Sequence, residues 1–271
     1  PPNRSNAVKN KVQKYRMMQE ESEMTETNTS GIITAAADII AGAFNALPKR
    51  VCNQHKFSDY ADYLHENLPA QAELDLQREK PLNPAPLVSV AIACSGASRA
   101  AVRSTLEALG KQTYANFEVC VVSELAQAGL TDYEGIPKFR LVLFNGTAHE
   151  QLKAAEKMLN GAYFLQLLPG DLPAPDALHM LVLQTHSNPE AEVVFADEDS
   201  VIDGIRQNPI FKPDYGRDTL RSFNSIGRPM LVSKRVHTAV GGFRGSTPAE
   251  LWAYCIDCAS AAKQVIHIAR I

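Results

Sequence analysis

Between residues 88 and 196, short apolar runs alternate with segments of helical periodicity, and this alternation constrains the fold more than any other feature. Nearly continuous apolar runs, typical of strands buried on both faces, occur at residues 88–94, 117–123, 139–144, 162–168 and 192–196. Helical periodicity occurs between them at residues 98–111, 148–159 and 176–185. The pattern predicts an α/β fold with a mostly parallel sheet and helices on both faces.

Ligands of such sheets bind beyond the carboxyl ends of the strands, so the residues at these ends are the candidate site. They include Ser95, Ser123, Glu124, Asp171, and the consecutive carboxylates Asp197, Glu198 and Asp199. Three carboxylates at the end of a buried strand need solvent, a cation or a metal. Lys212 and Arg206 are the candidate partners, and two interpretations stay open: a ligand contact in a cleft, or a salt-bridged strand end.

The first 86 residues have a different pattern and are predicted to be helical. Residues 1–50 form a predicted helical arm, in which the apolar side chains of residues 32–47 recur as one stripe. This run is too short to span a bilayer. It fits a helix packed on a domain, on a protein partner or on a second copy, or a helix lying at a membrane surface. Residues 51–86 form a predicted helical connector, with helices at 57–68 and 69–78 and a proline-rich hinge at 80–86.

Charge and cysteine usage exclude some classes of function. The formal net charge is -3, and no basic patch indicates nucleic-acid binding. Five cysteines without a secretory signal favour reduced thiols and a cytoplasmic location, including the inner face of the membrane. Cys255 and Cys258 lie within a predicted helix at 249–262, which favours two ordinary helix cysteines over a redox motif. The isolated His149, His179 and His237 are expected on the surface.

Several motifs in fixed order resemble the GT-A fold of family-2 glycosyltransferases. The letters QTYANFEV at residues 112–119 are similar to the family's QTYxNFEV segment. The letters GAYF at 161–164 and PDAL at 175–178 resemble the segment that contains the family's Asp-x-Asp motif. The letters FADED at 195–199 and NPIFKPD at 208–214 resemble the version in bacterial enzymes that build O-antigen and other surface polysaccharides. The letters GGFR at 241–244 resemble the motif that precedes the family's catalytic helix. The resemblance covers residues 57–271.

The resemblance implies a nucleotide-sugar-dependent transferase, but the positions of its working carboxylates carry other residues. The family's nucleotide-binding aspartate falls on Ser123, with Glu124 beside it. Its metal-binding Asp-x-Asp falls on residues 168–170, and only the adjacent Asp171 is a carboxylate. Its catalytic base falls on Pro248, and Glu250 is the nearest carboxylate.

Three interpretations follow. The first, which we favour, is a glycosyltransferase-like domain with degraded catalytic motifs. It would be a non-catalytic or weakly active module for binding or scaffolding in surface-polysaccharide assembly. The second is an active transferase that uses Mn²⁺ or Mg²⁺ with a nucleotide-diphosphate sugar. Asp171 and Asp199 would then hold the metal, and Glu250 would be the base. The third is an unrelated α/β nucleotide-binding protein, whose strand order would differ from that of the GT-A fold.

Overall fold

The computed structural model describes residues 56–124 and 136–271, and the predicted helical arm at residues 1–50 lies outside them. The chain divides into two compact units. One unit combines Pro1–Leu68 with Asp199–Phe211, and the other combines Pro69–Glu198 with Lys212–Ile271. The second unit, called the α/β unit below, contains the large sheet. The predicted domain boundary near residue 87 stays a prediction.

The α/β unit is built on a seven-stranded sheet with the order β3-β2-β1-β4-β8-β5-β9. Its strands are β1 (Val88–Ala93), β2 (Phe117–Ser123), β3 (Phe139–Leu143), β4 (Tyr163–Leu167), β5 (Ala191–Ala196), β8 (Met230–Ser233) and β9 (Gln264–Ile268). All neighbouring strands are parallel except β8, which is antiparallel to both β4 and β5. The mixed, mostly parallel sheet that the sequence predicts is confirmed.

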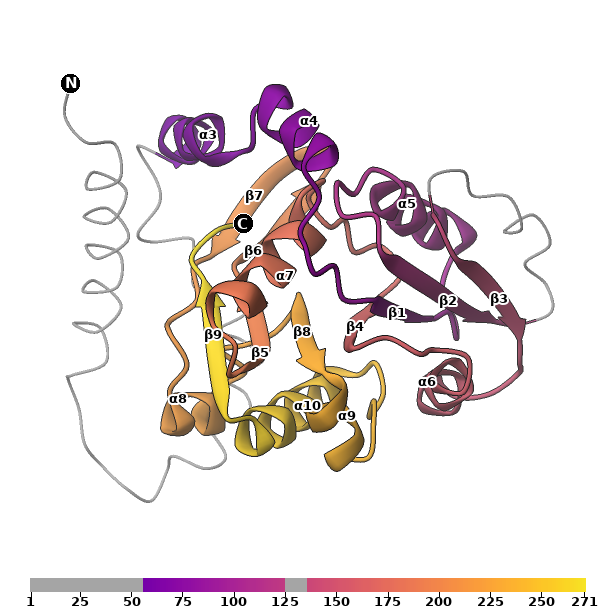
Figure 1. Cartoon of the computed structure of the whole chain (residues 1–271). Helices are drawn as coiled ribbons and strands as arrows, with labels where there is room; N and C mark the ends of the chain where they lie inside the picture. Colours follow the sequence, from indigo (N-terminus) through magenta and orange to yellow (C-terminus); the bar gives the residue numbers. More distant parts are fainter. Residues whose placement is uncertain (1–55, 125–135) are drawn as a thin grey trace, which may run out of the picture. The chain divides into compact units, whose positions relative to one another are not determined.

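Side chains from the two faces of the sheet enter two separate apolar cores, because successive residues of a strand point to opposite sides. In β1, Val88, Val90 and Ile92 pack into the core that α5 (Arg99–Leu109) and α7 (Ala177–Ser187) cover. Ala91 and Ala93 pack into the other core. That face is covered by α6 (Ala148–Glu156), α8 (Arg217–Ser222), α9 (Lys234–Ala239) and α10 (Pro248–Ala261). Figure 1 shows α5 and α6 on opposite sides of β1, β2 and β3.

The strands and helices predicted between residues 88 and 196 are all present, with ends that differ by at most three residues. The helices of the connector are present as α3 (Lys56–Asn67) and α4 (Gln71–Glu79). Strands β8 and β9 were not predicted. In the described residues, no helix is both long enough and apolar enough to cross a bilayer.

The other unit contains α3 and a hairpin of two strands, β6 (Glu198–Ile202) and β7 (Ile205–Ile210), whose first residue belongs to the α/β unit. Asp203 and Gly204 form its turn with φ values of 53° and 77°. Two consecutive positive φ values are the signature of a type I′ turn, which suits the twist of a hairpin. The ring of Tyr63 stacks on Tyr60 and meets the edge of Phe211, so α3 packs against the end of β7.

The cysteines in the described residues are free thiols inside the α/β unit. Cys94, Cys120, Cys255 and Cys258 are all buried. Burial raises the pKa of the Cys120 thiol to about 11 and that of Cys255 to about 12. Since the thiolate is the reactive form, Cys255 and Cys258 are unreactive side chains on the core face of α10, as the sequence predicts.

Candidate functional site

The carboxyl ends of β1 and β2 form the first part of the predicted site. Gln151, at the start of α6, accepts hydrogen bonds through Oε1 from the backbone N–H groups of Cys94 and Ser95, each at 2.9 Å. These two hydrogen bonds hold the backbone that follows β1 in place. Ser95 is exposed. Ser123 is fully buried at the end of β2, and among residues 56–124 and 136–271 its hydroxyl has no hydrogen-bond partner. Glu124, the next residue, is exposed.

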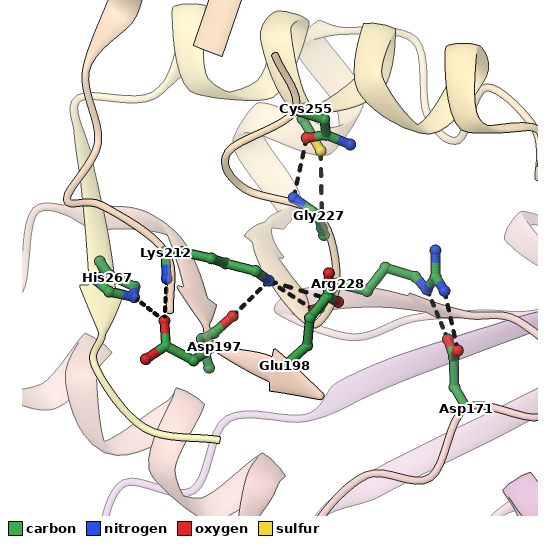
Figure 2. Close-up of polar contacts among 10 residues, drawn as sticks. Asp171, Asp197, Glu198, Lys212, Gly227, Arg228, Cys255 and His267 are labelled. Carbon is green, nitrogen blue, oxygen red and sulfur yellow. Dashed lines mark hydrogen bonds and ion pairs between the residues drawn. The ribbon is translucent and has the colours of Figure 1, made fainter. Parts of the chain in front are cut away.

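Hydrogen bonds hold the Asp171 carboxylate in the loop after β4, and Figure 2 shows those from Arg228. The Asp171 carboxylate accepts the backbone N–H of Leu168 at 2.8 Å, which makes a tight turn. The guanidinium of Arg228 binds both carboxylate oxygens, with Nε–Oδ2 at 2.8 Å and Nη2–Oδ1 at 3.1 Å. Burial opposes the charge on Arg228, but the bonds to Asp171 raise the pKa of the guanidinium. Asp171 is therefore a turn residue and the anion of a bidentate ion pair.

Asp197 lies at the end of β5 and is almost completely buried. Its Oδ1 accepts the backbone N–H of Lys212 at 2.8 Å and lies 2.7 Å from His267 Nε2. The other ring nitrogen of His267 lies 3.1 Å from Asp214, and its ring stacks on Phe195. The carboxylate of Asp197 thus joins β5, β9 and the segment after the hairpin, as Figure 2 shows for Lys212 and His267.

Lys212 is the central cation of this end of the sheet, and its side chain is 2% exposed. Nζ donates to the carbonyl oxygens of Ala196 at 2.6 Å and Arg228 at 2.8 Å, and lies 3.7 Å from Glu198 Oε2. Burial lowers the pKa of Lys212, and the nearby Glu198 and Asp197 oppose that shift. Because Arg228 also holds Asp171, one polar network connects the ends of β4 and β5. Figure 2 shows this network between Asp171 and His267.

Asp199 belongs to the unit that contains α3 and the hairpin, and its carboxylate binds side chains of that same unit. Its Oδ2 accepts hydrogen bonds from Tyr60 at 2.5 Å and from Arg206 Nε at 2.7 Å. Burial, followed by the bond to Asp199, raises the pKa of the Tyr60 hydroxyl. The two cations predicted for the carboxylate cluster are thus found in contact with it, Lys212 with Asp197 and Glu198, and Arg206 with Asp199.

The turn at residues 241–243, before α10, is held by a partly buried polar cluster. Gly242 has a φ of 82°, and a Cβ there would collide with the carboxylate of Glu156. Glu156 accepts the backbone N–H of Phe243 at 2.5 Å and lies 3.3 Å from His237 Nε2. Glycine is needed at this turn because it allows both the positive φ and the close approach. The cluster therefore positions the chain that enters α10.

Glu250 completes a capping box at the start of α10. Its Oε2 accepts the hydroxyl of Thr247 at 2.7 Å and the backbone N–H of Thr247 at 3.0 Å. These bonds lower the pKa of Glu250, which makes its carboxylate a weaker proton acceptor. Thr147 and Glu150 form the same arrangement at α6. The role of Glu250 as a base stays a prediction.

Two of the three histidines expected on the surface are buried. His237 is 5% exposed, stacks on Phe164 at 4.1 Å between ring centroids, and contacts the Tyr254 hydroxyl at 2.7 Å. His179 is 8% exposed, and burial lowers its pKa. The prediction was wrong because both residues lie on the core sides of helices. Only His149 is exposed as expected.

The described side chains do not fit the divalent metal that the resemblance implies. Over residues 56–124 and 136–271, no three His, Cys, Asp or Glu side chains lie close enough together to hold a metal ion. The two predicted ligands each have a cation partner, Arg228 for Asp171 and Arg206 for Asp199. A hard cation needs several oxygen ligands in one place.

Sequence comparison identifies two long relatives of this chain. The uncharacterized protein y4gI of Sinorhizobium fredii is 30% identical over 199 residues, which cover 69% of this chain and 22% of y4gI. The O-antigen biosynthesis protein RfbC of Myxococcus xanthus is 25% identical over 196 residues, which cover 69% of this chain and 15% of RfbC. The chain thus spans less than a quarter of the length of either relative. No family model matches the sequence.

Structure comparison identifies solved proteins with the same fold. Residues 1–349 of TarS from S. aureus superpose with a TM-score of 0.52 at 16% identity, over 67% of this chain and 58% of that chain. The same region in complex with UDP-GlcNAc gives a TM-score of 0.52 at 16% identity, over 67% of this chain and 56% of that chain. This structural likeness excludes an unrelated α/β fold. The chain therefore has the GT-A fold of glycosyltransferases, as its resemblance to family 2 implied.

Proposed function

We propose that this chain is a non-catalytic GT-A module that serves binding or scaffolding in the assembly of cell-surface polysaccharide. The GT-A fold and the likeness to the O-antigen biosynthesis protein RfbC support the polysaccharide context. The non-catalytic role is our inference from the contacts at the ends of β2, β4 and β5. A transferase of this type must hold a nucleotide, neutralise its diphosphate and deprotonate an acceptor hydroxyl.

One observation carries the proposal: the bidentate ion pair between Arg228 and Asp171. Asp171 is the only carboxylate at the predicted metal-binding loop, and its oxygens are bound by Arg228 and by the backbone N–H of Leu168. A metal there would have to displace the guanidinium. Metal ions supply several kcal/mol of charge stabilisation in such reactions, so their loss lowers the rate strongly.

The alternative is an active transferase that extends a bacterial polysaccharide. Two observations favour it: Glu198 stays one-third exposed at the end of β5, and TarS, which has the same fold, has been solved with UDP and with UDP-GlcNAc. In this case Asp171, Asp197, Asp199 and Glu250 would share the metal and base roles. The donor sugar would be bound at the carboxyl ends of β1, β2 and β4.

Calorimetry separates the two functions. The full chain is titrated with UDP-GlcNAc and with guanosine and thymidine diphosphate sugars, with and without Mn²⁺, and release of the nucleoside diphosphate is measured in parallel. We expect no metal-dependent binding and no turnover. Micromolar binding that requires Mn²⁺ and disappears in Asp171→Asn, together with release of the nucleoside diphosphate, would establish the active alternative. Asp218→Asn is the matched control, because the Asp218 side chain is 98% exposed.

The scaffolding role also assigns a task to residues 1–50, whose apolar stripe at 32–47 suits a protein partner or a second copy. Sedimentation velocity of the full chain tests self-association directly. If the stripe joins two copies, Ile40→Glu shifts the sedimentation coefficient to that of a monomer. A monomer at every concentration would contradict self-association, and the stripe would then be expected to bind a different protein.

A further inference from the structure

The unit that contains α3 and the hairpin has no core among its described residues. Residues 60–68 and 199–211 are all half-buried or exposed. Ile202 is 45% exposed and Ile205 is 58% exposed. A two-stranded hairpin is at most marginally stable in water unless a helix or further strands cover an apolar face. The rest of this unit is residues 1–55, so its apolar cover has to come from them or from another molecule.

Helix α3 contacts one face of the hairpin, and two isoleucines lie on the other. Tyr60 of α3 donates to Asp199, which also binds Arg206, so the carboxylate and the guanidinium mark the face toward α3. Successive side chains of a strand point to opposite faces. Ile202 comes three residues after Asp199 and therefore lies on the opposite face, and so does Ile205, which precedes Arg206. The two-residue turn sets these isoleucines opposite each other, and the pair is called the open face below.

The segment at residues 32–47 has the chemistry that suits the open face. Its apolar side chains recur as one helical stripe, and Asp38 is its only ionisable residue. A helix of 16 residues is about 24 Å long, and a strand of five residues such as β6 is about 17 Å long. The stripe is therefore long enough to cross the whole open face.

The connection to α3 favours the hairpin of the same chain. Eight residues, 48–55, separate the stripe from α3, which begins at Lys56. Fully extended, this connection spans at most about 30 Å, and α3 already contacts the hairpin through Tyr60 and Tyr63. A short connection of this kind gives an effective concentration in the millimolar range. A second copy at micromolar concentration competes poorly with it.

We propose that residues 32–47 dock on the open face of the hairpin in the same chain and cover Ile202 and Ile205 with the apolar stripe. The hairpin then has α3 on one face and the stripe on the other, which gives this unit its core. The contact goes beyond the proposed function, because a protein partner or a second copy that takes the stripe has to displace the hairpin first. It does not depend on whether the α/β unit transfers sugar.

Hydrogen exchange of the full chain, followed by mass spectrometry, tests the docking. We expect the amides of residues 32–47 to be protected, and Ile205→Glu to speed their exchange at least about tenfold, because a carboxylate is costly to bury under apolar side chains. Leu76→Glu on α4 is the matched control, since Leu76 is 49% exposed in the α/β unit, and it should leave this exchange unchanged. In the reciprocal experiment, Ile40→Glu should speed the exchange of the hairpin amides at residues 201–206. If Ile205→Glu changes the exchange of residues 32–47 no more than Leu76→Glu does, the docking is wrong.

A dilution series distinguishes the chain's own hairpin from that of a second copy. With sedimentation velocity in parallel, the protection of residues 32–47 should stay constant between about 100 and 1 μM, because contact within one chain does not depend on concentration. Protection that disappears together with a dimer on dilution would overturn the assignment to the same chain. Ile202→Glu repeats the test at the second residue of the open face. Circular dichroism identifies a variant that fails to fold, and the other variant then decides.

Discussion

Replacing Arg228 by methionine tests whether the cation holds the loop after β4. The substitution keeps most of the apolar stem and removes both hydrogen bonds to Asp171, at 2.8 and 3.1 Å. At an effective dielectric constant of about 20, charges 3 Å apart attract by roughly 5 kcal/mol, most of which is offset by desolvation. Breaking a fully buried pair costs about 3–5 kcal/mol, whereas an exposed pair is worth about 0.2–1 kcal/mol.

The ion pair lies between these limits, because its side chains are 30% and 23% exposed. We therefore expect Arg228→Met to lower the free energy of unfolding by about 2 kcal/mol, with a fall in Tm of about 4–8 °C for a protein of this size. Urea denaturation followed by circular dichroism measures the first quantity. In a double-mutant cycle with Asp171→Asn, the coupling energy should be about 1–2 kcal/mol.

Arg221→Met is the matched control. Arg221 lies 4.0 Å from Asp218, and both side chains are mostly exposed, so its loss should cost less than about 0.5 kcal/mol. If Arg228→Met costs no more than Arg221→Met, Asp171 is not held by the guanidinium. The carboxylate would then be available to a metal, and the main support for a non-catalytic module would be lost.

Three further substitutions test other parts of the structure. Burial would raise the pKa of Glu118, but hydrogen bonds from Asn160 N–H, Ser89 and Arg140 outweigh it and lower the pKa. The ionised Glu118 therefore stabilises the folded state fully above pH 4.5, and this contribution is lost as the pH falls through the folded-state pKa. In urea melts, Arg140→Met should cost about 1–2 kcal/mol at pH 7 and less at pH 4. Gly242→Ala should cost about 1 kcal/mol more than Gly241→Ala, since both have positive φ but only the first displaces the hydrogen-bonded end of the Glu156 side chain; equal losses would contradict the close approach. Thr247→Ala should lower stability by about 1 kcal/mol through loss of the α10 cap, and an unchanged Tm would argue against the capping box.

The sheet was predictable where its strands are buried on both faces. Strands β1, β2 and β4 are continuous apolar runs because helices cover them on each side, and the sequence pattern shows this directly. β9 is an edge strand with a mostly half-buried pattern, and β8 has only four residues, so neither produces a strong signal. The hairpin is polar along most of its length, and its Asp203-Gly204 turn is the one local signal that could have identified it.

The candidate site was predictable only where partners are close in the sequence. Lys212 follows Asp197 by 15 residues, and Arg206 follows Asp199 by seven, so both could be named as partners of the carboxylates. Arg228 is 57 residues from Asp171, and His267 is 70 residues from Asp197. Such pairs are set by the topology of the sheet, and no pattern in either segment indicates them.

The position of β5 has a consequence for how the chain folds as it is synthesised. The strands β3, β2, β1 and β4 are neighbours in the sheet and are complete once residue 167 has left the ribosome. β5 pairs with β8 and β9, which end at residues 233 and 268. Its apolar Val193, Val194 and Phe195 therefore have no strand partner until the final third of the α/β unit is made. Nascent chains that end between residues 196 and 230 are the ones we expect to recruit chaperones or aggregate.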